Sequence, residues 1–252
     1  MASLVLVRHG KTEWVKQNRF AGWSDAPLSE QGREEASMAG RSLAERGIRF
    51  DLCHTSMLSR AEETLRLLLE SLGQPELPRK RSWRLNERHY GALQGMNRTK
   101  AALEFGNDKI GQWRRDYRAR PPSQAQEASD HPHSDPKYRD VDKALLPETE
   151  SLEDAALRVL PWWDKEILPD LKSDKNVLVV AHTASIRGLV RHIESLSDEE
   201  TEAYRIATCV PVAYRFDRDL ALIEKEEIIS GLSSRIRRFL NKHKPGKAIS
   251  WI

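Results

Sequence analysis

Cysteine and long apolar runs are both scarce in this chain. Its two cysteines, Cys53 and Cys209, are too few for a disulfide framework and show no metal-binding spacing. No run approaches the roughly 18 apolar residues that span a bilayer. The first apolar run, 4–7, is interrupted at once by Arg8 and His9, so it does not read as a signal peptide. We therefore expect a reduced, cytoplasmic protein without a membrane partner.

The chain also lacks a large excess of charge of one sign. It has 41 Lys and Arg residues against 38 Asp and Glu residues, for a formal net charge of +3. No continuous basic stripe suggests a nucleic-acid partner, but arginines recur beside candidate site residues. These arginines are Arg8, Arg60, Arg84, Arg88, Arg98, Arg114 and Arg115. This distribution favours a small anionic substrate.

Short runs rich in valine and leucine alternate with amphipathic stretches. We expect strands at 3–8, 51–56, 176–181, 212–216 and 221–226. We expect helices at 29–47, 58–72 and 185–196, with Ser29 as an N-cap and Gly73 as a stop. This alternation predicts a three-layer α/β/α fold with a mostly parallel central sheet. In such sheets, ligands bind beyond the carboxyl ends of the strands.

The segment from about 97 to 146 breaks the alternation. It holds one expected helical piece, 103–117, and then a polar stretch rich in Pro, Ser and His. We interpret the segment as a long insertion over the active site of one catalytic domain, 1–231, because long loops in compact proteins often act as lids or binding elements. The remaining residues, 232–252, predict a basic C-terminal helix and tail.

Arg8, His9 and Gly10 follow the first expected strand and suit chemistry on a phosphate ester. A neutral imidazole accepts a phosphoryl group near neutral pH and divides one transfer into two easier steps. An adjacent arginine offers paired donors to phosphate oxygens, and glycine permits a close backbone approach. The tripeptide alone also fits an ordinary strand end. It gains weight because a second histidine, His182, follows the expected strand 176–181.

Other polar residues have both a functional and a structural interpretation. Arg60 begins an expected helix, where it can bind an anion with the helix N-terminus or remain a solvated charge. Glu87 can carry a proton to or from a hydroxyl, or be an ordinary ion-paired glutamate. Arg114 and Arg115 can bind a carboxylate or a second phosphate, or form an exposed pair on a helix.

Seven segments between Leu4 and about Asp217 share a pattern. They are LVLVRHG (4–10), NRFAGWSDAPLSEQG (18–32), TSMLSRA (55–61), SWRLNERHYGALQGMNR (82–98), WRRDY (113–117), LPETESL (146–152) and AHTASIRGLVRH (181–192). Together they resemble the histidine phosphatase superfamily and, within it, the cofactor-dependent phosphoglycerate mutases. The fourth segment is decisive, because the wider superfamily lacks it.

This resemblance implies the phosphoglycerate mutase-like fold and an isomerase of glycolysis and gluconeogenesis that interconverts 3-phosphoglycerate and 2-phosphoglycerate. It implies His9 as the phosphorylated nucleophile, primed by 2,3-bisphosphoglycerate without a metal, and Glu87 as general acid and base. Arg8, Arg60 and His182 would form the phosphate pocket. The residues that the resemblance assigns to substrate binding are Thr12, Ala21, Gly22, Tyr90, Arg98, Arg114, Arg115 and Thr183.

The resemblance also implies small phosphorylated glycerates as partners and a homodimer or homotetramer as the assembly. We expect no nucleic-acid partner, because the basic C-terminal segment lacks an aromatic series for stacking. We expect no metal, because His131 and His133 come without companion ligands at a suitable spacing.

The chain departs from the mutase pattern near the expected phosphate site. Mutases carry asparagine where this chain has Val15 and usually threonine where it has Ala21. They carry glycine and asparagine in place of Thr183 and Ala184. They carry lysine in place of Arg98, whereas bisphosphoglycerate mutases have arginine there, as this chain does. A hydrogen bond to a charged group contributes about 1.5–3 kcal/mol. The sequence therefore leaves three alternatives open: a bisphosphoglycerate mutase or phosphatase, another histidine phosphatase with an altered substrate, and a silent binding homologue.

Overall fold

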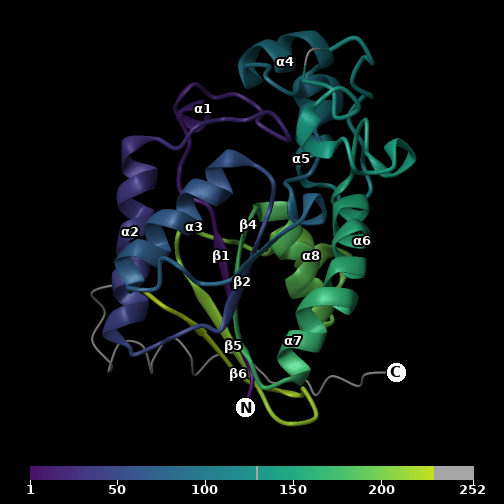
Figure 1. Cartoon of the computed structure of the whole chain (residues 1–252). Helices are drawn as coiled ribbons and strands as arrows, with labels where there is room; N and C mark the ends of the chain where they lie inside the picture. Colours follow the sequence, from purple (N-terminus) through teal and green to yellow (C-terminus); the bar gives the residue numbers. More distant parts are fainter. Residues whose placement is uncertain (129, 230–252) are drawn as a thin grey trace.

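A six-stranded sheet runs through the computed structural model, which describes residues 1–128 and 130–229 (Figure 1). Its strands are β1 (Ser3–Arg8), β2 (Leu52–Thr55), β3 (Arg79–Arg81), β4 (Asn176–Ala181), β5 (Val212–Phe216) and β6 (Leu222–Glu227). They lie in the order β3-β2-β4-β1-β5-β6. The first four are parallel, whereas β5 and β6 add an antiparallel edge. The predicted mostly parallel α/β fold is confirmed.

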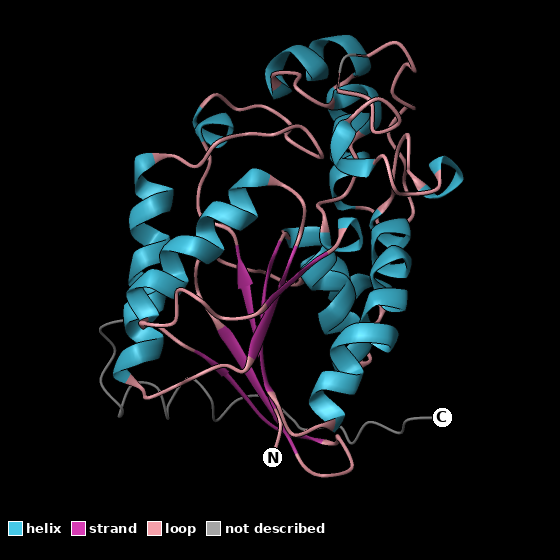
Figure 2. Cartoon of the chain, in the orientation of Figure 1, coloured by secondary structure: helices cyan, strands magenta, loops and turns pink. Residues whose placement is uncertain are grey.

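Helices cover both faces of the sheet (Figures 1 and 2). On one face lie α2 (Glu30–Glu45) and α3 (Ser59–Leu72), and on the other lie α6 (Leu152–Trp162), α7 (Leu168–Lys172) and α8 (Thr183–Glu194). The apolar run of β1 serves both layers. Leu4 and Leu6 belong to the core under α6 and α8, while Val5 and Val7 belong to the core under α2 and α3. Alternate side chains of a strand point to opposite faces, which explains why this strand is apolar throughout.

Most of the predicted elements are confirmed within a few residues. The Ser29 side chain caps α2 by accepting from the Gly32 N–H, and Gly73 ends α3 in a left-handed conformation. The strand β3 was not expected, because its three basic residues carry no apolar pattern. The helices α6 and α7 were not expected either. A π-helical segment, Trp163–Ile167, connects them.

The predicted single helix at 103–117 is wrong. The structure has two helices there, α4 (Arg98–Phe105) and α5 (Asn107–Arg115). Gly106 separates them with φ of 85°, a left-handed conformation that an α-helix does not contain. Two other short α-helices are α1 (Glu13–Lys16) and α9 (Asp198–Ala203).

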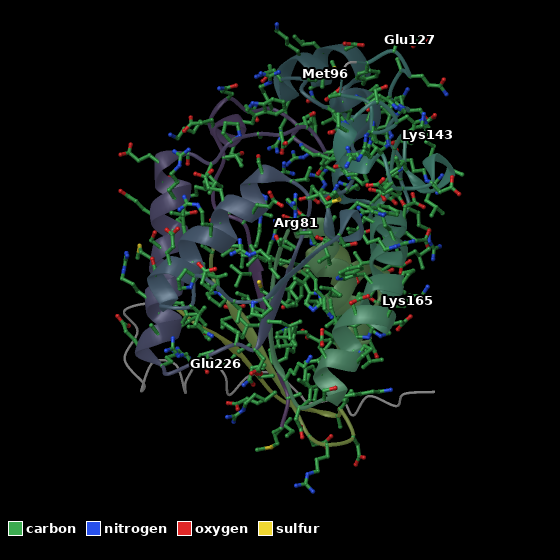
Figure 3. All side chains as sticks on the ribbon, in the orientation of Figure 1. Arg81, Met96, Glu127, Lys143, Lys165 and Glu226 are labelled. Atoms are coloured by element: carbon green, nitrogen blue, oxygen red, sulfur yellow. The ribbon has the colours of Figure 1, made fainter. Side chains whose placement is uncertain are left out.

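The insertion lies beyond the carboxyl ends of β1 and β4, with α4 and α5 above the sheet (Figure 1). Glu127, within it, lies at the opposite end of the molecule from Glu226 on β6 (Figure 3). The Ser24 hydroxyl donates to Asp130 at 2.6 Å, which joins the insertion to the body of the protein. The predicted C-terminal helix and tail, 232–252, lie outside the described residues, so the domain limits stay a prediction. None of the helices that the structure describes is long and apolar enough to cross a membrane.

Candidate active site

A cavity of about 560 Å³ opens between the insertion and the carboxyl ends of β1 and β4. Arginine is its dominant charged residue, with Arg8, Arg19, Arg60, Arg88, Arg98, Arg114, Arg115, Arg187 and Arg205 in the wall. The acidic residues in the wall are Glu87, Glu199 and Glu202. A hollow with so strong a positive bias attracts and concentrates an anionic ligand.

His9 lies at the floor of this cavity, directly after β1. Its backbone N–H donates to the Ala181 carbonyl at 3.0 Å, and its side chain is 6% exposed. Nδ1 is 2.7 Å from the Gly10 carbonyl oxygen, which can only accept. Nδ1 therefore carries the hydrogen and Nε2 holds the free lone pair. Burial, reinforced by the charges of Arg60 and Arg8, keeps the pKa of His9 well below its ordinary value, so the imidazole is neutral.

Gly10 is required by packing against α2. Its N–H donates to the Thr64 hydroxyl at 3.0 Å. A Cβ at this position would lie 2.3 Å from the Gly32 carbonyl oxygen. The close approach that this glycine allows is therefore to the start of α2, and it fixes the chain immediately after His9.

Arg60 and Arg8 flank His9 from two elements. Arg60, near the start of α3, is 1% exposed and donates to the Ser24 carbonyl at 3.0 Å and the Gly22 carbonyl at 2.6 Å. Burial lowers its pKa, and it forms no ion pair with any residue that the structure describes. Arg8 donates to the Ile206 carbonyl at 2.9 Å. Both guanidinium groups are thus held by neutral carbonyls, which leaves their charge available for an anion.

His182 lies beside His9, with ring centroids 4.9 Å apart. It is fully buried behind the cavity wall, just before α8. Its Nε2 is 2.7 Å from the Ser56 hydroxyl, and its Nδ1 has no hydrogen-bond partner in the described part of the chain. Burial, followed by the charge of Arg60, holds the pKa of His182 well below its ordinary value. The second imidazole is therefore also neutral.

The carboxylate of Glu87 rests on the N-terminus of α8. It accepts backbone N–H bonds from Ala184 at 3.0 Å, from Thr183 at 3.2 Å and from Arg88 at 2.9 Å. Within residues 1–128 and 130–229, Glu87 forms no salt bridge, which removes the ion-paired interpretation. The unpaired N–H groups of a helix start are a favourable place for a carboxylate.

The structure brings the predicted site residues together. All except His182 line the cavity, including Thr12, Ala21 and Gly22. Arg98 lies over the Phe20 ring at 5.3 Å, and burial lowers its pKa. The Tyr90 ring also contacts Phe20, with centroids 5.2 Å apart. Arg114 and Arg115 are exposed at the end of α5.

Arg88 and Arg187 are among the cavity arginines that the sequence did not identify as binding candidates. Arg88 is 4% exposed, and its Nε and Nη1 are buried without a partner in the described residues. Arg187 donates from Nε and Nη2 to the Tyr204 carbonyl at 2.9 and 2.7 Å. Its position four residues after Thr183 places both on one face of α8, a signal that the sequence carried.

The positions that depart from the mutase pattern also lie in the wall. Val15 is 51% exposed beside the cavity, and Ala184 is 4% exposed at the first turn of α8. Ala21 and Thr183 line the same hollow. Three of these four side chains are apolar, so they offer no hydrogen bond to an anion bound against His9.

Residues 4–134 and 123–227 match the family profile of the histidine phosphatase superfamily, branch 1. The chain belongs to the histidine phosphatase superfamily. A relative from Borreliella burgdorferi (strain ZS7), named 2,3-bisphosphoglycerate-dependent phosphoglycerate mutase, is 46% identical over 87% of this chain and 89% of its own. A relative of the same name from Streptococcus pyogenes serotype M5 is 45% identical over 92% of this chain and 100% of its own. The predicted resemblance to the cofactor-dependent mutases is confirmed.

Solved structures share the fold. An alpha-ribazole phosphatase from Shigella flexneri superposes with a TM-score of 0.66 at 22% identity, covering 88% of this chain and 94% of its own. Among the described residues of this histidine phosphatase, no group of three or more His, Cys, Asp or Glu side chains is arranged to hold a metal ion.

Proposed function

We propose that this histidine phosphatase homologue is a phosphoglycerate mutase that interconverts 3-phosphoglycerate and 2-phosphoglycerate in glycolysis and gluconeogenesis. The observation that carries the proposal is the neutral His9 with a free Nε2 in an arginine-lined cavity, whose wall also holds Glu87. Relatives at 45–46% identity bear the corresponding name. The cytoplasmic location and the homodimer or homotetramer stay predictions.

His9 and the arginines beside it would carry the phosphoryl transfer. Arg8 and Arg60 bind the phosphate oxygens, which neutralises charge that would repel the nucleophile. The lone pair of His9 Nε2 forms a bond to phosphorus while the P–O bond of the ester breaks. The bonding electrons remain with the departing oxygen. His182, whose Nδ1 lacks a partner in the described residues, lies close enough to His9 to donate to the transferred group.

Glu87 would supply and retrieve the proton. In its carboxylic acid form it gives a proton to the departing glycerate oxygen, and as a carboxylate it takes the proton of the hydroxyl that attacks the phosphohistidine. The substrate carboxylate and distal groups meet Arg98, Arg114 and Arg115 at the outer wall. A glycerate that turns over within this hollow presents its other hydroxyl to the same phosphohistidine, which gives the isomer.

The residues present fit 2,3-bisphosphoglycerate as a primer. Buried guanidinium N–H groups of Arg8, Arg88 and Arg98 have no partner in the described part of the chain, and each residue lines the cavity. Such donors are costly to leave unpaired, and they suit a ligand with several anionic oxygens. When bound, the primer would supply the phosphoryl group that first phosphorylates His9.

The test is to incubate the protein with 2,3-bisphosphoglycerate and measure acid-labile phosphate by intact mass, alongside conversion of 3-phosphoglycerate with and without the primer. We expect one phosphate per chain, absent from His9→Asn, and isomerisation stimulated by the primer. Labelling with rapid release of inorganic phosphate and little isomerisation would identify a phosphatase instead. No labelling would contradict both.

A further inference from the structure

A buried ion pair lies behind Glu87 and outside the cavity wall. Arg158, on α6, donates from Nε to Glu150 Oε1 at 2.6 Å and from Nη2 to Oε2 at 3.0 Å. Arg158 is 8% exposed and Glu150 is 3% exposed. A buried pair is by itself weak evidence for stability, because desolvation of both charges offsets their attraction. Its presence in the core therefore calls for another explanation.

The guanidinium of Arg158 also binds the backbone that carries Glu87. Nη1 donates to the carbonyls of Trp83 at 3.0 Å and Arg84 at 2.8 Å. Nη2 donates to the carbonyls of Asn86 at 3.3 Å and Glu87 at 3.1 Å. Four carbonyls of one short segment therefore converge on one planar cation.

Glu150 holds the other side of Glu87. Its Oε2 accepts from the His89 N–H at 2.8 Å, and its own N–H donates to the His89 carbonyl at 2.9 Å. The Glu87 carbonyl also accepts from Trp23 Nε1 at 2.6 Å. The ion pair therefore binds the backbone before Glu87, at Glu87 itself and two residues after it.

The two ends of Glu87 are anchored to two helices that pack as one unit. Its backbone is held by Arg158 of α6, and its carboxylate by the first N–H groups of α8. These helices are in close contact, since a Cβ at Gly188 of α8 would lie 2.8 Å from the Ala156 Cα of α6. If the 83–89 segment shifted, α8 would stay in place because it is packed against α6. The Glu87 carboxylate would therefore move relative to His9.

We propose that the Glu150–Arg158 pair positions Glu87 for proton transfer, an inference that rests on the proposed role of Glu87 in the mutase reaction. Neither residue lines the cavity, so both are positioning residues. Arg158→Lys retains the positive charge but replaces a planar fork by a single ammonium, which cannot hold four carbonyls and a carboxylate together. The variant therefore separates geometry from charge.

The test exploits the dependence on the leaving group. We would measure the burst rate of His9 phosphorylation with 2,3-bisphosphoglycerate, whose alkoxide leaving group needs a proton, and with 4-nitrophenyl phosphate, whose phenolate does not. We expect Arg158→Lys to slow the first by about 10- to 100-fold, part of the 10²–10⁴-fold that a positioned acid contributes. The burst with the aryl ester should stay within about 3-fold, as general-acid catalysis is not needed there. Glu87→Gln should reproduce this selectivity.

Arg46→Lys is the matched control, because Arg46 forms a partly buried ion pair with Glu226 far from the cavity. It should leave both burst rates unchanged. If Arg158→Lys does not fold, as judged by its thermal melt, Glu150→Gln decides by the same two rates. Equal losses on the two esters, or no loss on either, would overturn the inference. A wild-type protein that forms no phosphohistidine from either ester would instead defeat the proposed function.

Discussion

His9 donates from Nδ1 to the Gly10 carbonyl oxygen over 2.7 Å, and this bond fixes the tautomer of the ring. Since Nδ1 is occupied, the phosphoryl group should be attached to Nε2. We expect ³¹P and ¹⁵N NMR of the phosphorylated protein to give the pattern of Nε2-phosphohistidine. A phosphate on Nδ1 would show that the ring turns over before it reacts.

His9, the proposed nucleophile, should remain active in mildly acidic solution. Burial holds the pKa of His9 well below 6.5, so the neutral, nucleophilic form persists as pH falls through that value. We expect the burst rate with 4-nitrophenyl phosphate to change by less than about 2-fold between pH 8 and about 5.5, where an imidazole with the ordinary pKa would be about nine-tenths protonated. A fall to half at pH 6.5 would contradict the neutral environment.

Loss of Arg88 should weaken substrate binding. Its buried Nε and Nη1 have no partner in the described residues, and it faces the cavity without an ion pair there. Arg88→Met therefore leaves no carboxylate without its partner, but it removes hydrogen-bond donors to the substrate. We expect KM to rise by about 10- to 100-fold, because each hydrogen bond to a charged group contributes about 1.5–3 kcal/mol. Arg66→Met is the control, since Arg66 pairs with Glu70 on the outer surface of α3. An unchanged KM would exclude contact with the substrate.

Amide side chains in the cavity wall should favour isomerisation over hydrolysis. Val15 and Ala184 line the hollow without a polar atom in their side chains. In the double variant Val15→Asn/Ala184→Asn, the new amides can donate to the bound bisphosphorylated glycerate, so its retention should improve. We expect the ratio of isomerisation to phosphate release to rise by about 10-fold, the lower end for a charged hydrogen bond.

Met38→Asn serves as the control for this double variant, because Met38 is 47% exposed on α2 and lies outside the cavity wall. It should leave the ratio unchanged. A ratio that stays constant in the double variant would mean that existing contacts already retain the glycerate.

The stability of the fold should fall as the solution is acidified below pH 6.5. Burial lowers the pKa of His54 to about 4 and that of His89 to about 3. Above pH 6.5 both histidines are neutral in the folded and unfolded chains, so they do not change the free energy of unfolding. Below it, the unfolded chain binds protons that the folded chain excludes. For His54 this loss runs from pH 6.5 to about 4, at up to about 1.4 kcal/mol per pH unit.

Urea unfolding between pH 7.5 and 4.5 checks this expectation. His54→Gln, which can still accept the hydrogen bond that Trp162 Nε1 donates to His54 Nδ1, should reduce the slope by up to one proton. A free energy of unfolding that is flat over this range would show that the buried histidines gain protons without unfolding.

Local pattern was enough for much of the fold. The strand at 176–181 is apolar throughout because both of its faces are covered, and its predicted limits match β4. Ser29 and Gly73 marked helix ends through capping chemistry that acts within a few residues. By contrast, β3 is paired to β2 although its side chains are basic, so only its neighbour in the sheet reveals it. Gly106 likewise broke a helix that the pattern of apolar residues had joined.

The candidate site divides in the same way. The sequence by itself predicted the candidate nucleophile, its neighbouring arginine and the candidate acid, because Arg8, His9 and Glu87 lie in short segments with residue types suited to phosphoryl transfer. Only the tertiary structure decided which nitrogen of His9 is free, that Glu87 lies on the start of α8, and that Arg158 holds its backbone. These features join residues up to about a hundred positions apart. Hydrogen bonds and burial depend on distance in space, which local sequence pattern does not encode.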